Sequence, residues 1–192
     1  EGLTALPLSL LNTHADIDHI GSNAEFDAVY MNPAELVNYP LAKKASDIIP
    51  VRDGNSIDLG GRRLEVIEIP GHTPGSIAIL DVERRVLFSG DTVQDGSIFL
   101  FGPMRNIPAF YHSLKRLEGM TGRFDLIYPS HGRFPVKKEL SSRLVSQTAK
   151  LERGELTATE TQFHGIPLKR YDADAAVFLC DADYGQDGRK EG

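Results

Sequence analysis

The sequence has little of what marks a disulfide-stabilised, membrane-spanning or nucleic-acid-binding protein. Its 192 residues include one cysteine, Cys180, which excludes an intrachain disulfide and disfavours a cysteine-based zinc site. No apolar run reaches the length of a membrane span, and no signal-peptide pattern is present. The net charge of −6, without a basic cluster, argues against nucleic acid as a partner. We therefore expect a cytoplasmic protein with neither nucleic acid nor a membrane as its partner.

The composition is that of a globular domain, with 41% hydrophobic and 25% charged residues. We expect one domain over residues 1–184 and a frayed polar tail over 185–192. Residues 6–11 are predicted to form a buried strand, and residues 22–46 to be mainly helical, with Pro33 in a first turn. The remaining predicted elements are a hairpin of 56–59 with 63–69 around Gly60 and Gly61, a hairpin of 76–81 with 85–88, a helix over 107–120 capped by Asn106, a strand over 124–128, a helix over 136–153, and strands over 168–171 and 176–180.

Clusters of polar residues follow four of the strand-like runs, at 13–21, 71–73, 90–92 and 130–132. Loops at strand ends are where a rigid scaffold places reactive side chains. The first cluster is the densest, with four potential metal ligands in the six residues from His14 to His19. In an extended segment, residues two apart share a face, so His14, Asp16 and Asp18 can converge. Burying so many such groups is costly unless a metal neutralises them, and imidazole with carboxylate suits zinc, iron or manganese.

The four clusters also resemble the metal-binding motifs of the metallo-β-lactamase superfamily. THADIDHIGSN resembles the motif T-H-x-H-x-D-H-x-G-x-N, and PGHTPGSIAIL, LFSGDTV and YPSHG are similar to the second, third and fourth motifs, in the family's order. The resemblance implies an α/β (α+β) fold, an αββα sandwich with the site at one edge between two sheets. Only about ten residues precede the first motif, where the family has several strands. We therefore expect an incomplete first sheet: either the chain is a fragment of a longer protein, or a partner chain in a homo-oligomer completes the sandwich.

Carried over residue by residue, the resemblance implies a two-metal site. The first metal would be held by His14, Asp16 and His72, the second by Asp18, His19 and His131, and Asp91 would bridge them. Two divalent transition metals, zinc before others, would supply a metal-bound hydroxide, which Asp18 would orient as the catalytic residue while relaying a proton. The implied reaction is hydrolysis of a small ester, thioester, lactone or amide, similar to that of glyoxalase II.

Asp16 departs from the family pattern, which has histidine at this position. With Asp18, Asp91 and one hydroxide, it brings four negative charges against the four positive charges of two divalent ions, which favours iron or manganese as alternatives. It could also have lost its ligand role, leaving one metal. Flavodiiron proteins share the fold, carry a carboxylate at this position and fit the eighteen residues between His72 and Asp91. A di-iron redox protein and an inactive metal-binding module therefore remain as alternatives. Arg105 and His164 are further cleft candidates, although a solvated loop position is the better explanation of His164.

Overall fold

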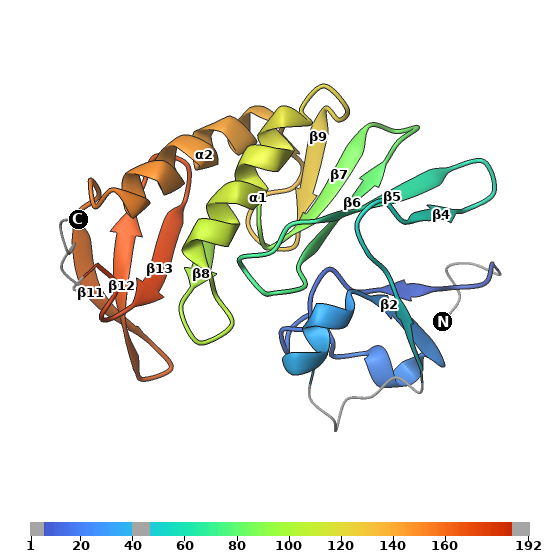
Figure 1. Cartoon of the computed structure of the whole chain (residues 1–192), viewed down its shortest axis with the longest axis horizontal. Coiled ribbons are helices and arrows are strands. Elements are labelled where there is room, and N and C mark those ends of the chain that lie inside the picture. The colour runs from blue at the N-terminus through green and yellow to red at the C-terminus, as the bar shows by residue number, and fades with distance from the viewer. Residues whose placement is uncertain (1–5, 40–46, 186–192) are drawn as a thin grey trace, which may run out of the picture.

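The computed structural model describes residues 6–39 and 47–185, whose strands form three sheets (Figure 1). Nearly all of the predicted tail, and residues 40–46 of the predicted helical segment, lie outside the described residues. The largest sheet has six strands in the order β10-β9-β7-β6-β5-β4. Its strands are β4 (Ser56–Asp58), β5 (Arg63–Glu68), β6 (Ile77–Asp81), β7 (Val86–Gly90), β9 (Leu126–Pro129) and β10 (Val136–Lys137). Both predicted hairpins are confirmed, as β4 with β5 and β6 with β7.

The six-stranded sheet is buried on both faces, as its alternating side chains require. Ile67 and Leu80 belong to the main core, together with the helical residue Phe110. Val66 and Ile79 point the other way, into a second cluster against which Tyr30 of the first sheet packs. Because successive residues of a strand face opposite sides, this sheet must lie between the helices and the first sheet.

Two α-helices in the described part of the chain pack against each other, with α1 beside the large sheet and α2 extending toward the third sheet (Figure 1). The first is α1 (Ile107–Gly119), whose N-terminus Asn106 caps by accepting a hydrogen bond from the Ala109 N–H, as predicted. The second is α2 (Glu139–Glu152). The prediction of a helix from residue 136 is wrong for its first two residues, which pair with β9 as β10.

The first sheet has three parallel strands, β1 (Leu10–Leu11), β2 (Ala28–Met31) and β3 (Asp47–Pro50). The prediction of a buried strand over residues 6–11 is wrong for its first part, because pairing starts at Leu10 and the side chain of Leu8 is 70% exposed. The helical prediction for residues 22–46 is wrong at β2, which lies between two partner strands that fix it as extended. The short 3-10 helices η1 (Asn23–Glu25) and η2 (Pro33–Val37) flank β2, with Pro33 at the start of the second.

The third sheet, in the order β11-β12-β13-β8, stands beside the large sheet (Figure 1). Its strands are β8 (Ser97–Leu100), β11 (Ala158–Phe163), β12 (Ile166–Asp172) and β13 (Val177–Asp181). The last two were predicted, whereas β3, β8 and β11 were not. The layers of short helices, first sheet, large sheet and α-helices form the αββα sandwich that the motifs implied. No helix in the described ranges has both the length and the apolarity that crossing a membrane requires.

Candidate metal centre

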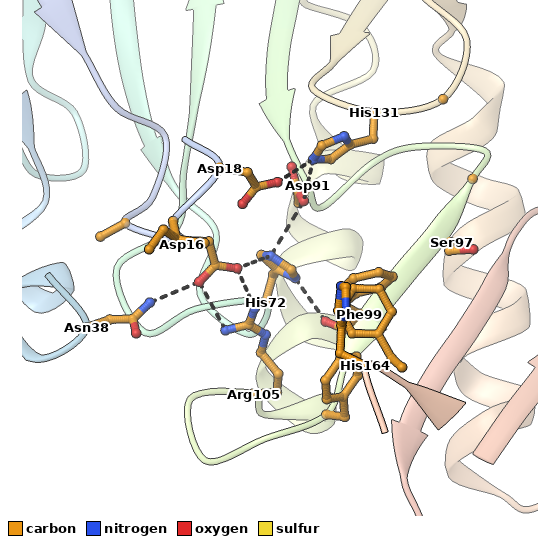
Figure 2. Close-up of a pocket in the computed structure, with 16 residues that line it drawn as sticks. Asp16, Asp18, Asn38, His72, Asp91, Ser97, Phe99, Arg105, His131 and His164 are labelled. Carbon is orange, nitrogen blue, oxygen red and sulfur yellow. Dashed lines mark hydrogen bonds and ion pairs between the residues drawn. The ribbon is translucent and has the colours of Figure 1, made fainter. Parts of the chain in front are cut away.

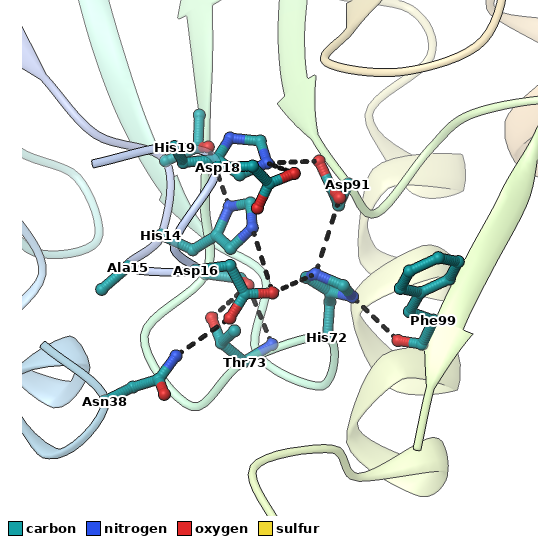
Figure 3. Close-up of polar contacts among 12 residues, drawn as sticks. His14, Ala15, Asp16, Asp18, His19, Asn38, His72, Thr73, Asp91 and Phe99 are labelled. Atoms are coloured by element: carbon teal, nitrogen blue, oxygen red, sulfur yellow. Dashed lines mark hydrogen bonds and ion pairs between the residues drawn. The ribbon is translucent and has the colours of Figure 1, made fainter. Parts of the chain in front are cut away.

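The four motif loops meet at one end of the sandwich, where the chain leaves β1, β5, β7 and β9. Asp91 follows β7 directly, His131 lies two residues after β9, and His72 lies in the loop between β5 and β6. Figure 3 shows the residues of the first motif facing His72 and Asp91 across a small space. The structure therefore brings all seven sequence-predicted ligands together: His14, Asp16, Asp18, His19, His72, Asp91 and His131.

One group of potential ligands is buried. The ligand atoms of His14, His72 and Asp91 all lie within 4.8 Å of one another. The side chains of His14 and His72 are only 1% and 2% exposed. Nδ1 of His72 is 3.0 Å from the carbonyl oxygen of Phe99, which can only accept a hydrogen bond. Nδ1 therefore carries the proton, and Nε2 presents its lone pair to the site.

The other group lies at the surface. The ligand atoms of Asp18, His19 and His131 also lie within 4.8 Å of one another. The side chains of Asp18 and His131 are 55% and 49% exposed. Asp91 lies between the two groups, with Oδ1 3.3 Å from Nε2 of His19 and Oδ2 3.4 Å from Nε2 of His131. Its second oxygen is also 3.7 Å from Nε2 of His72, so this carboxylate is placed to serve both groups.

The buried nitrogens of this cluster have no hydrogen-bond partner among the described residues. Nε2 of His14, His19 and His72, together with Oδ1 of Asp91, is buried and makes no hydrogen bond. Leaving a polar atom buried without a partner costs about 1–3 kcal/mol. Imidazole nitrogens and a carboxylate that converge in this way are a donor set suited to zinc and similar ions. The residues present therefore fit a transition-metal site.

Asp16 faces the buried group but is also held from behind. Its Oδ2 is 3.2 Å from Nε2 of His72 and 3.7 Å from Nε2 of His14. The same oxygen forms an ion pair with Nη2 of Arg105, and Oδ1 accepts a 2.9 Å hydrogen bond from Asn38 (Figures 2 and 3). Arg105 was a minor candidate in the sequence, and Asn38 was not singled out at all. A positive charge therefore stands beside the carboxylate that replaces the family's histidine.

The charges of the cluster shift its pKa values. Burial, reinforced by the neighbouring imidazoles of His72 and His19, lowers the pKa of His14 to about 3. Burial also opposes the ionisation of Asp16, but contact with His72 and the charge of Arg105 outweigh it and hold the pKa of Asp16 below its ordinary value. Burial lowers the pKa of His19 as well, but the carboxylate of Asp91 outweighs that effect and raises it.

A buried carboxylate ties two of the motif loops together. Oε2 of Glu35 accepts a 2.6 Å hydrogen bond from the Ala15 N–H, and Oε1 accepts one of 2.6 Å from the Gly75 N–H. Glu35 is fully buried in η2. It therefore fixes the loop that carries His14 relative to the loop that carries His72. No local pattern in the sequence indicates this role, since Glu35 lies 40 residues from Gly75.

Two glycines allow the loops to approach so closely. Gly71 has φ +134°, and a Cβ there would lie 2.2 Å from the backbone nitrogen of Phe110 in α1. Gly90 has φ +54°, and a Cβ there would lie 2.9 Å from Oγ1 of Thr13. Side chains at either position would strain the backbone and push the loops apart. These glycines place His72 against α1 and Asp91 against the first motif.

The centre opens into a cavity of about 840 Å³. One side is lined by metal-site residues and Ile17, and the other by Phe99, Phe101, Phe163 and His164. His164, a minor candidate in the sequence, therefore reaches the site (Figure 2). The phenylalanines were missed, although the alternation of Phe99 and Phe101 in SIFLFG would have indicated a strand with aromatic residues on one face.

The fold and this cluster define an α/β protein with a candidate transition-metal centre. Residues 7–131 match the family model of the metallo-beta-lactamase superfamily, and the chain belongs to this superfamily. The crystal structure of TTHA1623 in a di-iron-bound form is similar with 30% identity and a TM-score of 0.59, covering 72% of this chain and 76% of that one. ST1585 from Sulfolobus tokodaii, at 19% identity and a TM-score of 0.63, covers 85% of this chain and 75% of its own, and shows the fold alone.

Curated relatives carry the names of hydrolases, in line with the hydrolase prediction. Acyl-coenzyme A thioesterase MBLAC2 of Gallus gallus is 32% identical over 162 residues, which cover 68% of this chain and 58% of that protein. Hydroxyacylglutathione hydrolase of Francisella tularensis subsp. tularensis is 31% identical over 124 residues, which cover 64% of this chain and 48% of that protein. The chain thus spans about half the length of these relatives.

Proposed function

We propose that this chain hydrolyses small acyl compounds, thioesters foremost, with the help of two divalent transition metal ions. The observation that carries the proposal is the set of buried Nε2 atoms of His14, His19 and His72, which converge without a hydrogen-bond partner among the described residues. The two curated relatives named above are called an acyl-coenzyme A thioesterase and a hydroxyacylglutathione hydrolase, which supports an acyl substrate. Lactones, esters and amides share the acyl carbonyl and form the rest of the substrate class.

His14, Asp16 and His72 would hold the first ion and Asp18, His19 and His131 the second, with Asp91 between them. Bound divalent ions lower the pKa of a coordinated water and polarise a carbonyl oxygen. Zinc is the first choice for this mixture of imidazole and carboxylate, and the three carboxylates make iron or manganese acceptable. The chain supplies orientation, since Phe99 fixes the imidazole of His72 and Glu35 fixes the two loops beneath it.

Asp18 is the residue that we expect to handle the proton. Hydrolysis of a thioester forms a bond between the water oxygen and the carbonyl carbon and breaks the bond between carbon and sulfur. The proton lost by water must reach the departing thiolate. Asp18 Oδ2 lies 3.2 Å from Nε2 of His131, on the exposed side of the cluster, where the leaving group would have access to solvent. It would orient the water, take its proton and return it to sulfur.

Metal analysis combined with a substrate panel tests this proposal. Protein prepared with zinc should contain up to two ions per chain and should cleave at least one of a thioester, a lactone and an ester. His72→Ala and Asp91→Asn should each lower turnover steeply and reduce the bound metal, whereas His112→Ala, at an exposed position of α1 that does not line the cavity, should change neither. Metal binding with no turnover on any acyl substrate would overturn the hydrolase proposal and leave a metal-binding module.

A di-iron redox protein is the second candidate, because Asp16 adds a carboxylate to the first group and TTHA1623 has been crystallised in a di-iron-bound form. Protein made without added zinc should then contain iron and consume oxygen with an electron donor. Stoichiometric zinc under the same conditions, with acyl hydrolysis, would decide against this candidate.

A further inference from the structure

Three phenylalanine rings form an aromatic wall on one side of the cavity. The ring centroid of Phe99 is 5.3 Å from that of Phe101 and 4.9 Å from that of Phe163. Phe101 and Phe163 are 5.9 Å apart, so the three rings form one continuous surface. Figure 2 shows Phe99 at the edge of the site, close to His72. We call Phe99, Phe101 and Phe163 the aromatic wall.

Two parts of the third sheet build this wall. In β8, Ile98 and Leu100 belong to the main core, so Phe99 and Phe101 point to the opposite side. Phe163 ends β11, which is separated from β8 by β12 and β13. Its ring nevertheless reaches that of Phe99, so the β11–β12 hairpin curls over the cavity. The hairpin turns at His164 and Gly165, with φ of +48° and +81°.

The aromatic wall leaves apolar surface open at the mouth of the cavity. Phe163 is 36% exposed, and across the cavity Ile17, between the ligand candidates Asp16 and Asp18, is 68% exposed. Apolar side chains that face each other across an open pocket are typical of a ligand site, because ligand pockets combine apolar walls with a few polar groups. Neither side chain is needed to complete the core.

The charges in the cavity decide which part of a ligand fits there. Among the described residues that line it, Arg105 is the only lysine or arginine, and it is already paired with Asp16. Asp18 and Asp91 add further negative charge. A phosphate or carboxylate of the substrate therefore finds no free cationic side chain on this wall, whereas an apolar group does.

We infer that the aromatic wall binds the apolar acyl chain of the substrate, an inference that rests on the proposed function. The backbone carbonyl of Phe99 holds the imidazole of His72, so the wall begins where the acyl carbonyl would lie. The chain would run from there along the three rings toward Ile17 and Phe163. The thiol part would leave by the exposed side, past Asp18 and His131. The substrate class is thus a thioester with an acyl group longer than acetyl.

A chain-length series on the zinc-loaded protein tests this inference. Acetyl, butanoyl, hexanoyl and octanoyl thioesters of N-acetylcysteamine should show kcat/KM rising by roughly twofold per added methylene, somewhat below the gain for full burial. Phe163→Ala should lower kcat/KM for the octanoyl ester about tenfold and leave the acetyl ester within twofold. Phe88→Ala removes a ring of similar exposure, 37%, that does not line this cavity, and should leave the series unchanged.

Binding of a non-hydrolysable probe separates this inference from the proposed function. The octyl thioether of N-acetylcysteamine should bind the protein measurably by calorimetry, about tenfold more weakly to Phe163→Ala than to Phe88→Ala. Thioether binding of this kind without thioester hydrolysis would support the acyl site and overturn the proposed reaction. Hydrolysis that is independent of chain length, or thioether binding equal in both variants, would overturn the acyl site and leave the reaction standing.

Discussion

The two halves of the candidate metal centre are built in different ways. The first half, around His14 and His72, is inside the protein, where both side chains are at most 2% exposed. The second half, around Asp18 and His131, has side chains that are about half exposed. The first half rests on the clamp of Glu35 and on the bond from His72 to Phe99. Preorganised ligands lose little freedom on binding, so we expect the first half to hold its ion more firmly.

The difference also separates two tasks within one site. In the proposed reaction, the buried half, beside the aromatic wall, would hold the acyl group. The exposed half would face the leaving group and water. A small site can thus combine rigidity and access because Asp91, which contacts both halves, links them.

The largest expected effect comes from removing one histidine of each half. His72→Ala should lower kcat/KM on the best acyl substrate roughly a thousandfold, about 4 kcal/mol of transition-state stabilisation, because it deletes an oriented and buried ligand. His131→Ala should cost only tenfold to a hundredfold, because exposed water can replace it. Steady-state kinetics with metal analysis of each variant measures both. Equal losses, or a larger loss for His131→Ala, would break the comparison.

Removing the Glu35 clamp should have the next largest effect, and on folding. Glu35→Ala leaves the N–H groups of Ala15 and Gly75 buried without an acceptor, which should cost about 2–4 kcal/mol of unfolding free energy. For a chain of this size that corresponds to a fall in melting temperature on the order of 5–15 °C. Thermal melts of the metal-free protein measure it, with Glu139→Ala, at the start of α2, as the control. A melting temperature of Glu35→Ala within about 2 °C of that of the wild type would show that the two loops do not need the Glu35 clamp.

The metal-ligand candidates and the residues that support them differ in how far the sequence could predict them. The ligand candidates were readable because they cluster: four fall between His14 and His19, and the others follow strand-like runs. Glu35, Asn38 and Phe163 were not readable, because each acts on residues brought near only by the tertiary fold. Glu35 joins loops that are 20 and 40 residues away, and Phe163 reaches across two strands.

The fold shows the same division. Elements with strong local signals, such as the hairpin around Gly60 and the helix capped by Asn106, lie where the sequence placed them. The elements that were wrong or missed take their conformation from neighbours. Strand β2, predicted as helix, is held extended by β1 on one side and β3 on the other. Pairing of this kind leaves no periodic trace in a four-residue segment.

The two halves should also respond oppositely to acid in the metal-free protein. His14 has a pKa of about 3 when folded and 6.5 as its ordinary value, so between these values the unfolded chain binds the extra proton and stability falls as the pH is lowered. From pH 6.5 to pH 5 this should cost about 2 kcal/mol. The raised pKa of His19 acts in the opposite sense, adding stability at low pH that is lost as pH rises through its folded pKa.

Urea unfolding at pH 6.5 and at pH 5, with a chelator present, isolates each contribution. His14→Gln should reduce the loss of stability on acidification, and His19→Gln should increase it. If both substitutions change the acid sensitivity in the same direction, the two halves do not differ electrostatically in the way their surroundings indicate.

The smallest expected effect concerns Arg105, whose positive charge lies beside the first half and not the second. Arg105→Met keeps the length of the side chain and removes a positive charge that lies beside Asp16, whose Oδ2 faces His72 and His14. The substitution has two opposing effects on the first ion. It removes the repulsion between the Arg105 guanidinium and the bound cation. It also removes one of the two groups that hold the Asp16 carboxylate in place, while the hydrogen bond from Asn38 remains. The loss of charge repulsion at such short range outweighs the loss of one restraint on Asp16, so we expect the first ion to bind roughly tenfold more tightly and the affinity for the second ion to stay unchanged.

Competition with a chromophoric chelator resolves the two binding steps. Arg116→Met, which breaks the 2.7 Å surface ion pair with Asp53, is the matched control. Weaker binding of the first ion would instead make Arg105 a positioning residue for Asp16, and an equal change at both ions would mean that its charge does not distinguish the buried half from the exposed one.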